Sequence, residues 1–269
     1  MSLLKSASAY ILVVLICGAC TRPLYTNTNR SYKKQVRAFS KIIQEYPLRD
    51  SFKTADQWVG TTNFSMRKPN YVIIHHTAQD STQQTLRTFT LPRTKVSSHY
   101  VIGRDGAVYH MLNDLLRAQH AGVSKWGSTT DLNSSSIGIE LDNNGKEPFA
   151  EEQINSLLLI LEKLQKAYSI PTANFLGHAD VAPGRKVDPS RYFPWENLAK
   201  AGFGIWYDTT KTQVPTDFNM MQGLRIIGYN TANEKNAIHS YRIHFTPNDT
   251  TKQLHDGDRK IIWELMKKR

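Results

Sequence analysis

A short apolar strand that ends in two histidines constrains this sequence more than any other segment. Residues 71–77 read YVIIHHT, so a run of strong strand formers leads directly into His75 and His76, and Pro69 and Asn70 precede it. We expect a buried strand whose carboxyl end places one imidazole in a cleft. Because side chains alternate along a strand, His76 should point away from His75 and pack beneath the site or support it.

A second polar cluster follows much later in the chain. Residues 177–188 read GHADVAPGRKVD and supply His178 and Asp188. Together with His75 they make two imidazoles and one carboxylate, a three-ligand set that leaves a catalytic zinc its open fourth position. A lone histidine at a strand end is usually an ordinary core or rim residue, so the predicted zinc site depends on the convergence of all three.

Two charged residues are candidates for the chemistry beside such a metal. Residues 136–141 read SIGIEL and predict a strand in which Glu140 lies between apolar neighbours. Burial there would raise its pKa and suit a general base, although Glu140 could instead pair with a basic side chain at the strand end. Lys186, two residues before Asp188, could stabilise a developing oxyanion or could be an ordinary surface lysine.

Other histidines are weaker candidates. His99 lies on a strand predicted over residues 97–102 and belongs either to the core or to the floor of the site. His120 lies in a predicted loop and either lines the substrate groove or has a structural role. We carry both forward as candidates for substrate binding, and His110 as structural.

The wider pattern predicts an α/β fold, with a mixed central sheet flanked by helices. Residues 151–168 form the clearest helix, because their apolar side chains fall on one stripe. After residue 203 the composition changes, and we expect a small C-terminal helical domain over residues 203–269. Its helical segments are predicted at residues 218–227, 236–245 and 251–266.

The N-terminus predicts an export signal. Lys5 precedes a short apolar run over residues 9–16, and the letters GAC end at Cys20. The run is too short to span a bilayer. Its end is similar to the bacterial lipobox, in which the cysteine becomes the lipidated first residue, although Cys17 stands where that pattern prefers leucine. We therefore predict a signal peptide over residues 1–19 and a membrane anchor through lipid on Cys20.

Residues 20–57 are predicted to be a tether followed by an N-terminal helix. Residues 21–35 are polar and rich in turn formers, which favours the tether. Apolar residues recur at helical spacing from Val36 onward, until Pro47 stops the pattern.

Charge and cysteine content restrict the partners and the cofactor. The net charge of +11 is diffuse, and it suits any anionic polymer or membrane surface as well as nucleic acid, which we do not expect as a partner. Both cysteines lie in the export segment, so the exported domain has no thiol for a disulfide, a nucleophile or a zinc ligand.

Four motifs occur in order at ordinary spacing within residues 58–202. They read VIIHHTA from Val72, SHYVI from Ser98, SIGIEL from Ser136 and HADVAPGRKVDP from His178. Together they resemble the N-acetylmuramoyl-L-alanine amidase type 2 family, which includes the peptidoglycan recognition proteins. A further run, RAQHAGVS from Arg117, is similar to the AmiD-type outer-membrane lipoproteins of that family.

The resemblance implies a role for each matching residue. His75, His178 and Asp188 match the zinc ligands, Glu140 the catalytic glutamate, and Lys186 the lysine that stabilises the oxyanion. It implies Zn²⁺ as cofactor, peptidoglycan or muropeptides as partner, and cleavage of the amide between the lactyl group of muramic acid and L-alanine. Residues 203–269 loosely resemble the helical peptidoglycan-binding module that follows such amidases.

One alternative from another functional class is a peptidoglycan recognition protein that binds without cleaving. Such proteins keep the groove but usually lose a zinc ligand, whereas all three ligand positions and Glu140 are filled in this sequence. A zinc protease of the common His-Glu-x-x-His type is excluded because that motif is absent. We therefore expect an amidase in the bacterial cell envelope, held at the outer membrane and facing the periplasm.

Overall fold

The computed structural model describes residues 24–44, 63 and 65–269. The chain divides into two compact units, Met1–Gly60 and Thr61–Arg269. The predicted signal peptide and Cys20 lie outside the described residues, as does Pro47. Within the described part, no helix has the length and apolar character needed to cross a membrane.

The described part of the first unit is one long helix, α1 (Thr26–Gln44), in which no residue is buried. It begins ten residues before Val36, so most of the segment predicted as a tether is helical. The threonines and asparagines at its start suggested turns. The residues that follow, however, keep the three- and four-residue spacing of a helix, because Tyr32 precedes Val36 by one turn.

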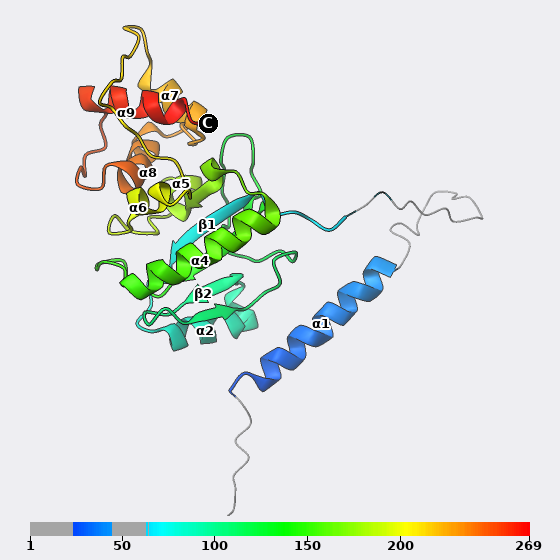
Figure 1. Cartoon of the computed structure of the whole chain (residues 1–269). Coiled ribbons are helices and arrows are strands. Elements are labelled where there is room, and N and C mark those ends of the chain that lie inside the picture. The colour runs from blue at the N-terminus through cyan, green and yellow to red at the C-terminus, as the bar shows by residue number, and fades with distance from the viewer. Residues whose placement is uncertain (1–23, 45–62, 64) are drawn as a thin grey trace, which may run out of the picture. The chain divides into compact units, whose positions relative to one another are not determined.

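The second unit contains one mixed sheet, part of which is labelled in Figure 1. Its strand order is β3-β2-β4-β1-β5. Strands β2, β4, β1 and β5 are parallel to their neighbours, and β3 pairs antiparallel with β2. The central strands β1 and β4 are nearly continuous apolar runs because both of their faces are covered. This confirms the predicted mixed α/β sheet. The strands are β1 (Tyr71–His76), β2 (Tyr100–Ile102), β3 (Val108–His110), β4 (Ser136–Leu141) and β5 (Phe175–Gly177).

Two hydrophobic clusters cover the two faces of the sheet. Val72 and Ile74 of β1 belong to the cluster that includes α4, whereas Ile73 between them belongs to the other, with α7, α8 and α9. The C-terminal helices, predicted as a separate domain, therefore share a core with the sheet. The helices of this unit are α2 (Thr82–Thr90), α3 (Leu132–Ser135), α4 (Glu151–Tyr168), α5 (His178–Val181), α6 (Trp195–Lys200), α7 (Met220–Ile227), α8 (Glu234–Phe245) and α9 (Asp256–Met266), with 3-10 turns at Pro92–Thr94 and Thr172–Asn174.

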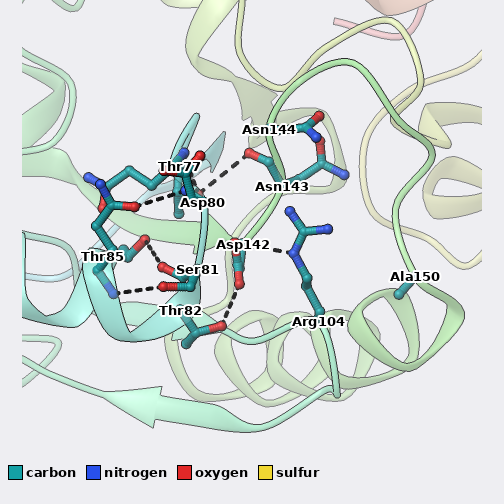
Figure 2. A network of polar contacts seen from close by, with 12 residues as sticks. Thr77, Asp80, Ser81, Thr82, Thr85, Arg104, Asp142, Asn143, Asn144 and Ala150 are labelled. Carbon is teal, nitrogen blue, oxygen red and sulfur yellow. Dashed lines mark hydrogen bonds and ion pairs between the residues drawn. The ribbon is translucent and has the colours of Figure 1, made fainter.

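Polar contacts hold the carboxyl ends of the two central strands. Asp142 directly follows β4 and is buried; its Oδ2 accepts a 2.6 Å hydrogen bond from the Thr82 hydroxyl, and its Oδ1 lies 3.6 Å from Arg104 Nε (Figure 2). The Ala78 N–H donates to the Asn143 carbonyl at 3.0 Å, which continues the pairing of β1 with β4 beyond the strands. This edge of the sheet carries the predicted site, so these contacts limit the movement of its strand ends.

The shared core makes a prediction about stability. Leu224→Ala on α7 should lower the free energy of unfolding by about 2–5 kcal/mol, because Leu224 is fully buried in the cluster that contains Ile73. Urea unfolding followed by tryptophan fluorescence should show one shifted transition. Ile226→Ala is the matched control, since Ile226 lies on the same helix and is 58% exposed. Two transitions, of which Leu224→Ala shifts only one, would contradict a shared core.

Candidate metal centre

The sheet register brings the predicted ligands to one edge. His75 of β1 lies opposite Glu140 of the parallel strand β4. On the other side of β1, Ile74 lies opposite Gly177 of β5, so His75 and His178 each come one residue later at the same edge. Asp188 returns to this edge because its carbonyl accepts a 2.7 Å hydrogen bond from the Ala179 N–H at the start of α5.

Three donor atoms of these residues form a tight triangle. His75 Nδ1 and His178 Nδ1 are 2.9 Å apart, and Asp188 Oδ2 lies 3.1 Å from the first and 3.0 Å from the second. All three residues are buried, between 1% and 8% exposed. Ligand atoms about 2.0 Å from a tetrahedral zinc are about 3.3 Å apart, so the triangle has close to the size that such a site requires.

Protons alone satisfy this triangle poorly. If both Nδ1 atoms carry hydrogen to reach Asp188, two N–H groups face each other; if only one does, a bare nitrogen lone pair faces the carboxylate. Buried polar atoms are normally paired, and a cation shared by the three donors satisfies all of them together. Among the residues that the structure describes, one group of His, Cys, Asp or Glu side chains lies close enough together to hold a metal ion. It consists of His75, His178 and Asp188. The residues present therefore fit a zinc ion.

Protonation states favour metal binding as well. Burial is the main cause that lowers the pKa of His75, to about 4, so its ring is neutral near pH 7. Burial by itself would raise the pKa of Asp188, but the neighbouring His178 and His75 side chains outweigh it and hold that pKa below its usual range. A neutral imidazole and an ionised carboxylate are the forms that bind a metal.

Each histidine is oriented through its second ring nitrogen. With Nδ1 in the triangle, His178 Nε2–H donates to the Ala121 carbonyl at 3.1 Å. Arg185 donates to the same carbonyl at 2.5 Å and so holds the acceptor in place. A second hydrogen bond of this kind sets the tautomer and the direction of a metal-binding imidazole.

For His75 that second partner is His120. His75 Nε2–H donates to His120 Nδ1 at 3.0 Å, and His120 Nε2–H then donates to the Ser136 hydroxyl at 3.2 Å. The Ser136 hydroxyl donates a hydrogen bond to the Leu132 carbonyl, so each donor in this series of hydrogen bonds has one acceptor. His120 is buried behind His75, which favours the structural role over contact with substrate.

Glu140 and Lys186 lie beside the triangle. Glu140 is buried, and burial raises its pKa to about 8, with the charge of Asp188 acting in the same direction and that of Lys186 opposing it. The poorly solvated carboxylate expected from the apolar strand is therefore present. Lys186 lies two residues before Asp188, and its positive charge lowers the pKa of both Glu140 and His75.

His99 belongs to the core. Its ring is fully buried, Nδ1 accepts a 3.0 Å hydrogen bond from the Gly138 N–H, and Nε2–H donates to the Leu116 carbonyl at 3.0 Å. Burial lowers its pKa to about 4, which agrees with this neutral tautomer. Of the two alternatives left open by the sequence, the structure places His99 in the core. His76 points away from His75, as expected, and its Nδ1 accepts from the Ser190 N–H at 3.1 Å.

Asp180 connects the segment that carries His178 to the C-terminal helical region. This connection was not predicted from the sequence. Its Oδ2 accepts hydrogen bonds from the Gly177 N–H and from His244 Nδ1, each at 2.7 Å, and its Oδ1 accepts one from the Tyr229 hydroxyl at 2.7 Å. Asp180 is buried and lies two residues after His178. The only signal in the sequence was its place within the HADV segment; nothing marked Tyr229 or His244 as its partners.

The space behind His75 gives the second prediction. A Cβ added at Gly138 would lie 2.5 Å from Cγ of His120, so Gly138→Ala should displace that ring and break its hydrogen bond to His75. Zinc affinity, measured by competition with a chelator, should fall about 10–100-fold. Gly257→Ala on α9 is the control, since a Cβ there meets nothing within 4 Å. Unchanged affinity in folded Gly138→Ala protein would show that His120 does not orient His75.

The Asp180 contacts give the third prediction. Tyr229→Phe removes one oxygen and leaves a buried carboxylate oxygen without its donor, so the free energy of unfolding should fall by about 1–3 kcal/mol. Zinc affinity should fall too, because Asp180 holds the start of α5. Tyr192→Phe, at a 48% exposed tyrosine, should change neither quantity. Loss of stability without any change in zinc affinity would mean that Asp180 does not support His178.

Comparisons with known proteins agree with this geometry. Residues 65–191 match the N-acetylmuramoyl-L-alanine amidase family. The chain is 31% identical over 208 residues to N-acetylmuramoyl-L-alanine amidase AmiD of Escherichia coli, covering 65% of this chain and 74% of that protein. It is 39% identical over 103 residues to the 1,6-anhydro-N-acetylmuramyl-L-alanine amidase AmpD of Haemophilus influenzae, covering 38% of this chain and 56% of that protein.

Solved structures show the same relationship. The E. coli AmiD structure in complex with the substrate anhydro-N-acetylmuramic acid-L-Ala-D-gamma-Glu-L-Lys has a TM-score of 0.68 at 28% identity, over 78% of this chain and 93% of that one. AmpDh3 from Pseudomonas aeruginosa also has a TM-score of 0.68, at 25% identity, over 81% of this chain and 99% of that one. This chain therefore belongs to the N-acetylmuramoyl-L-alanine amidase family.

Proposed function

We propose that this chain is an N-acetylmuramoyl-L-alanine amidase that uses zinc to hydrolyse the amide between the lactyl group of muramic acid and L-alanine of peptidoglycan stem peptides. The buried triangle of His75, His178 and Asp188 is the single observation that carries this proposal. The family of the chain supports the reaction. The structural neighbour bound to an anhydro-muropeptide supports peptidoglycan or its fragments as substrate.

The residues of the site divide the chemistry among them. Zinc, when bound to the triangle, supplies Lewis acidity for the amide carbonyl and lowers the pKa of the attacking water. Glu140, a buried carboxyl beside the triangle, would accept a proton from the attacking water and pass it to the leaving amine. Lys186 provides positive charge beside the developing oxyanion.

The alternative of a protein that only recognises peptidoglycan is less well supported. Binding alone needs neither the triangle nor a buried carboxylate at Glu140, although burying these groups costs free energy. A recognition protein of this family should contain no stoichiometric zinc, so metal analysis of the purified protein separates the two functions.

Location in the cell is the other part of the proposal. Lipid on Cys20, after removal of residues 1–19, would attach residues 20–57 to the outer membrane and leave the amidase in the periplasm, where its substrate lies. We keep residues 58–202 as the zinc amidase domain and residues 203–269 as a helical, peptidoglycan-binding-like domain. The amidase family of the chain is consistent with work in the cell envelope.

Glu140→Gln tests the proposed base. The amide keeps the shape of the carboxylate but cannot accept the proton, so turnover of a defined muropeptide, followed by mass spectrometry, should fall about 10²–10⁴-fold. Bound zinc should stay at one ion per chain, because the three ligands are intact. Glu147→Gln makes the same chemical change at a surface residue that pairs with Arg104 and should leave turnover unchanged. Wild-type turnover in Glu140→Gln would remove Glu140 from the mechanism.

A further inference from the structure

Helix α1 carries large apolar side chains that no described residue of its own unit covers. Val36, Phe39, Ile42 and Ile43 are between 38% and 72% exposed, and no residue of the helix is buried. Apolar side chains that are exposed to water along one side of a helix do not stabilise the protein. We therefore expect another surface to cover them.

The apolar side chains fall on one side of the helix. Tyr32, Val36, Phe39 and Ile43 follow one another at intervals of four, three and four residues, which places them in one stripe along the axis. Ile42 lies at the edge of this stripe. We call these five residues the apolar stripe.

The opposite side is basic. Arg30, Lys34, Arg37 and Lys41 repeat the same intervals of four, three and four residues, and Lys33 lies beside them. The helix contains no aspartate or glutamate. These five cations, which we call the basic face, have no acidic partner within the helix itself.

A helix of this kind matches the surface of an anionic bilayer. Amphipathic helices with Lys and Arg on the polar side and a stripe of aromatic and aliphatic side chains lie in the plane of the interface, with the stripe below the headgroups. Each cation near an anionic surface adds about 1 kcal/mol to binding. The 19 residues of α1 extend over about 28 Å, long enough to place the whole stripe in that plane.

Charge argues against the two other surfaces that could cover the stripe. A second copy of α1 would add five more positive charges and no acidic residue to offset them. The rest of the chain is also net positive, because α1 holds five of the net eleven positive charges. The charge of the chain therefore favours an anionic partner.

We propose that α1 is a membrane-surface helix, which lies flat on an anionic phospholipid bilayer with the apolar stripe inserted and the basic face among the headgroups. The helix starts six residues after Cys20, so a lipid there would hold it at such a surface, but the proposal needs only the two faces of α1. It is independent of the amidase chemistry, which lies in the other unit.

Vesicle binding of the full chain with Cys20→Ser tests this proposal without any contribution from a lipid anchor. Binding is measured by co-sedimentation with phosphatidylglycerol vesicles and with phosphatidylcholine vesicles, at low and high salt. Phe39→Asp should weaken binding to the anionic vesicles about tenfold or more. Leu159→Asp, at a 62% exposed leucine of α4, is its control. Because all variants share the same N-terminus, differences between them report on α1.

The basic face is tested in the same way. Replacing Arg37 and Lys41 together by glutamate should weaken binding about 25-fold or more, and high salt should weaken the parent chain similarly. The control replaces Lys163 and Lys166 on α4, two exposed lysines, by glutamate and so makes the same change in net charge. Unfolding of all variants in urea should match the parent chain, which shows that the second unit is intact.

Each other outcome would overturn the proposal. Equal binding to phosphatidylcholine vesicles, or equal losses in the α4 controls, would show that α1 does not select an anionic surface. A dimer in sedimentation velocity that Phe39→Asp abolishes, without vesicle binding, would assign the apolar stripe to a second copy. Binding to purified sacculi but not to vesicles would assign the basic face to peptidoglycan.

Discussion

The rest of the structure depends on one arrangement, three buried donor atoms about 3 Å from one another at the end of a parallel sheet. Hydrogen atoms pair two imidazole nitrogens and a carboxylate oxygen poorly in such a triangle, whereas one divalent cation satisfies all three. The surrounding contacts hold this arrangement in place. The Ala121 carbonyl orients His178, and the chain through His120 and Ser136 orients His75. Without those supports the same three side chains would have ordinary rotamer freedom, and the cation would lose much of its affinity.

The C-terminal helices belong to this support. Tyr229 and His244 both donate to Asp180, whose other hydrogen bond holds the start of α5 next to His178. The same helices cover one face of β1 through Ile73. The proposed role in binding peptidoglycan is compatible with a role in stabilising the site, because the first would use the surface of these helices and the second uses their buried side. Substitutions of buried residues in this region should therefore lower the affinity of the metal centre.

The two units differ in which side chains they bury and which they expose. The second unit encloses a few charged groups so that their pKa values shift and a metal can bind, which requires burial from several elements. Helix α1 does the opposite, because it exposes both an apolar stripe and a basic face along one short segment. Both proposals give the chain anionic partners, peptidoglycan for the second unit and a phospholipid surface for α1.

The sequence by itself determined the strands and helices around the site, and the residues with metal-binding chemistry, because strand periodicity and the short motifs that contain these residues are local properties of the chain. It could not separate the roles of His99 and His120, since both are histidines near strands and only packing shows that one lies in the core and the other behind His75. It also gave no sign that Asp180 would find its partners 49 and 64 residues away. Such contacts were decided only by tertiary structure, because a hydrogen bond between distant segments depends on which faces the whole core brings together.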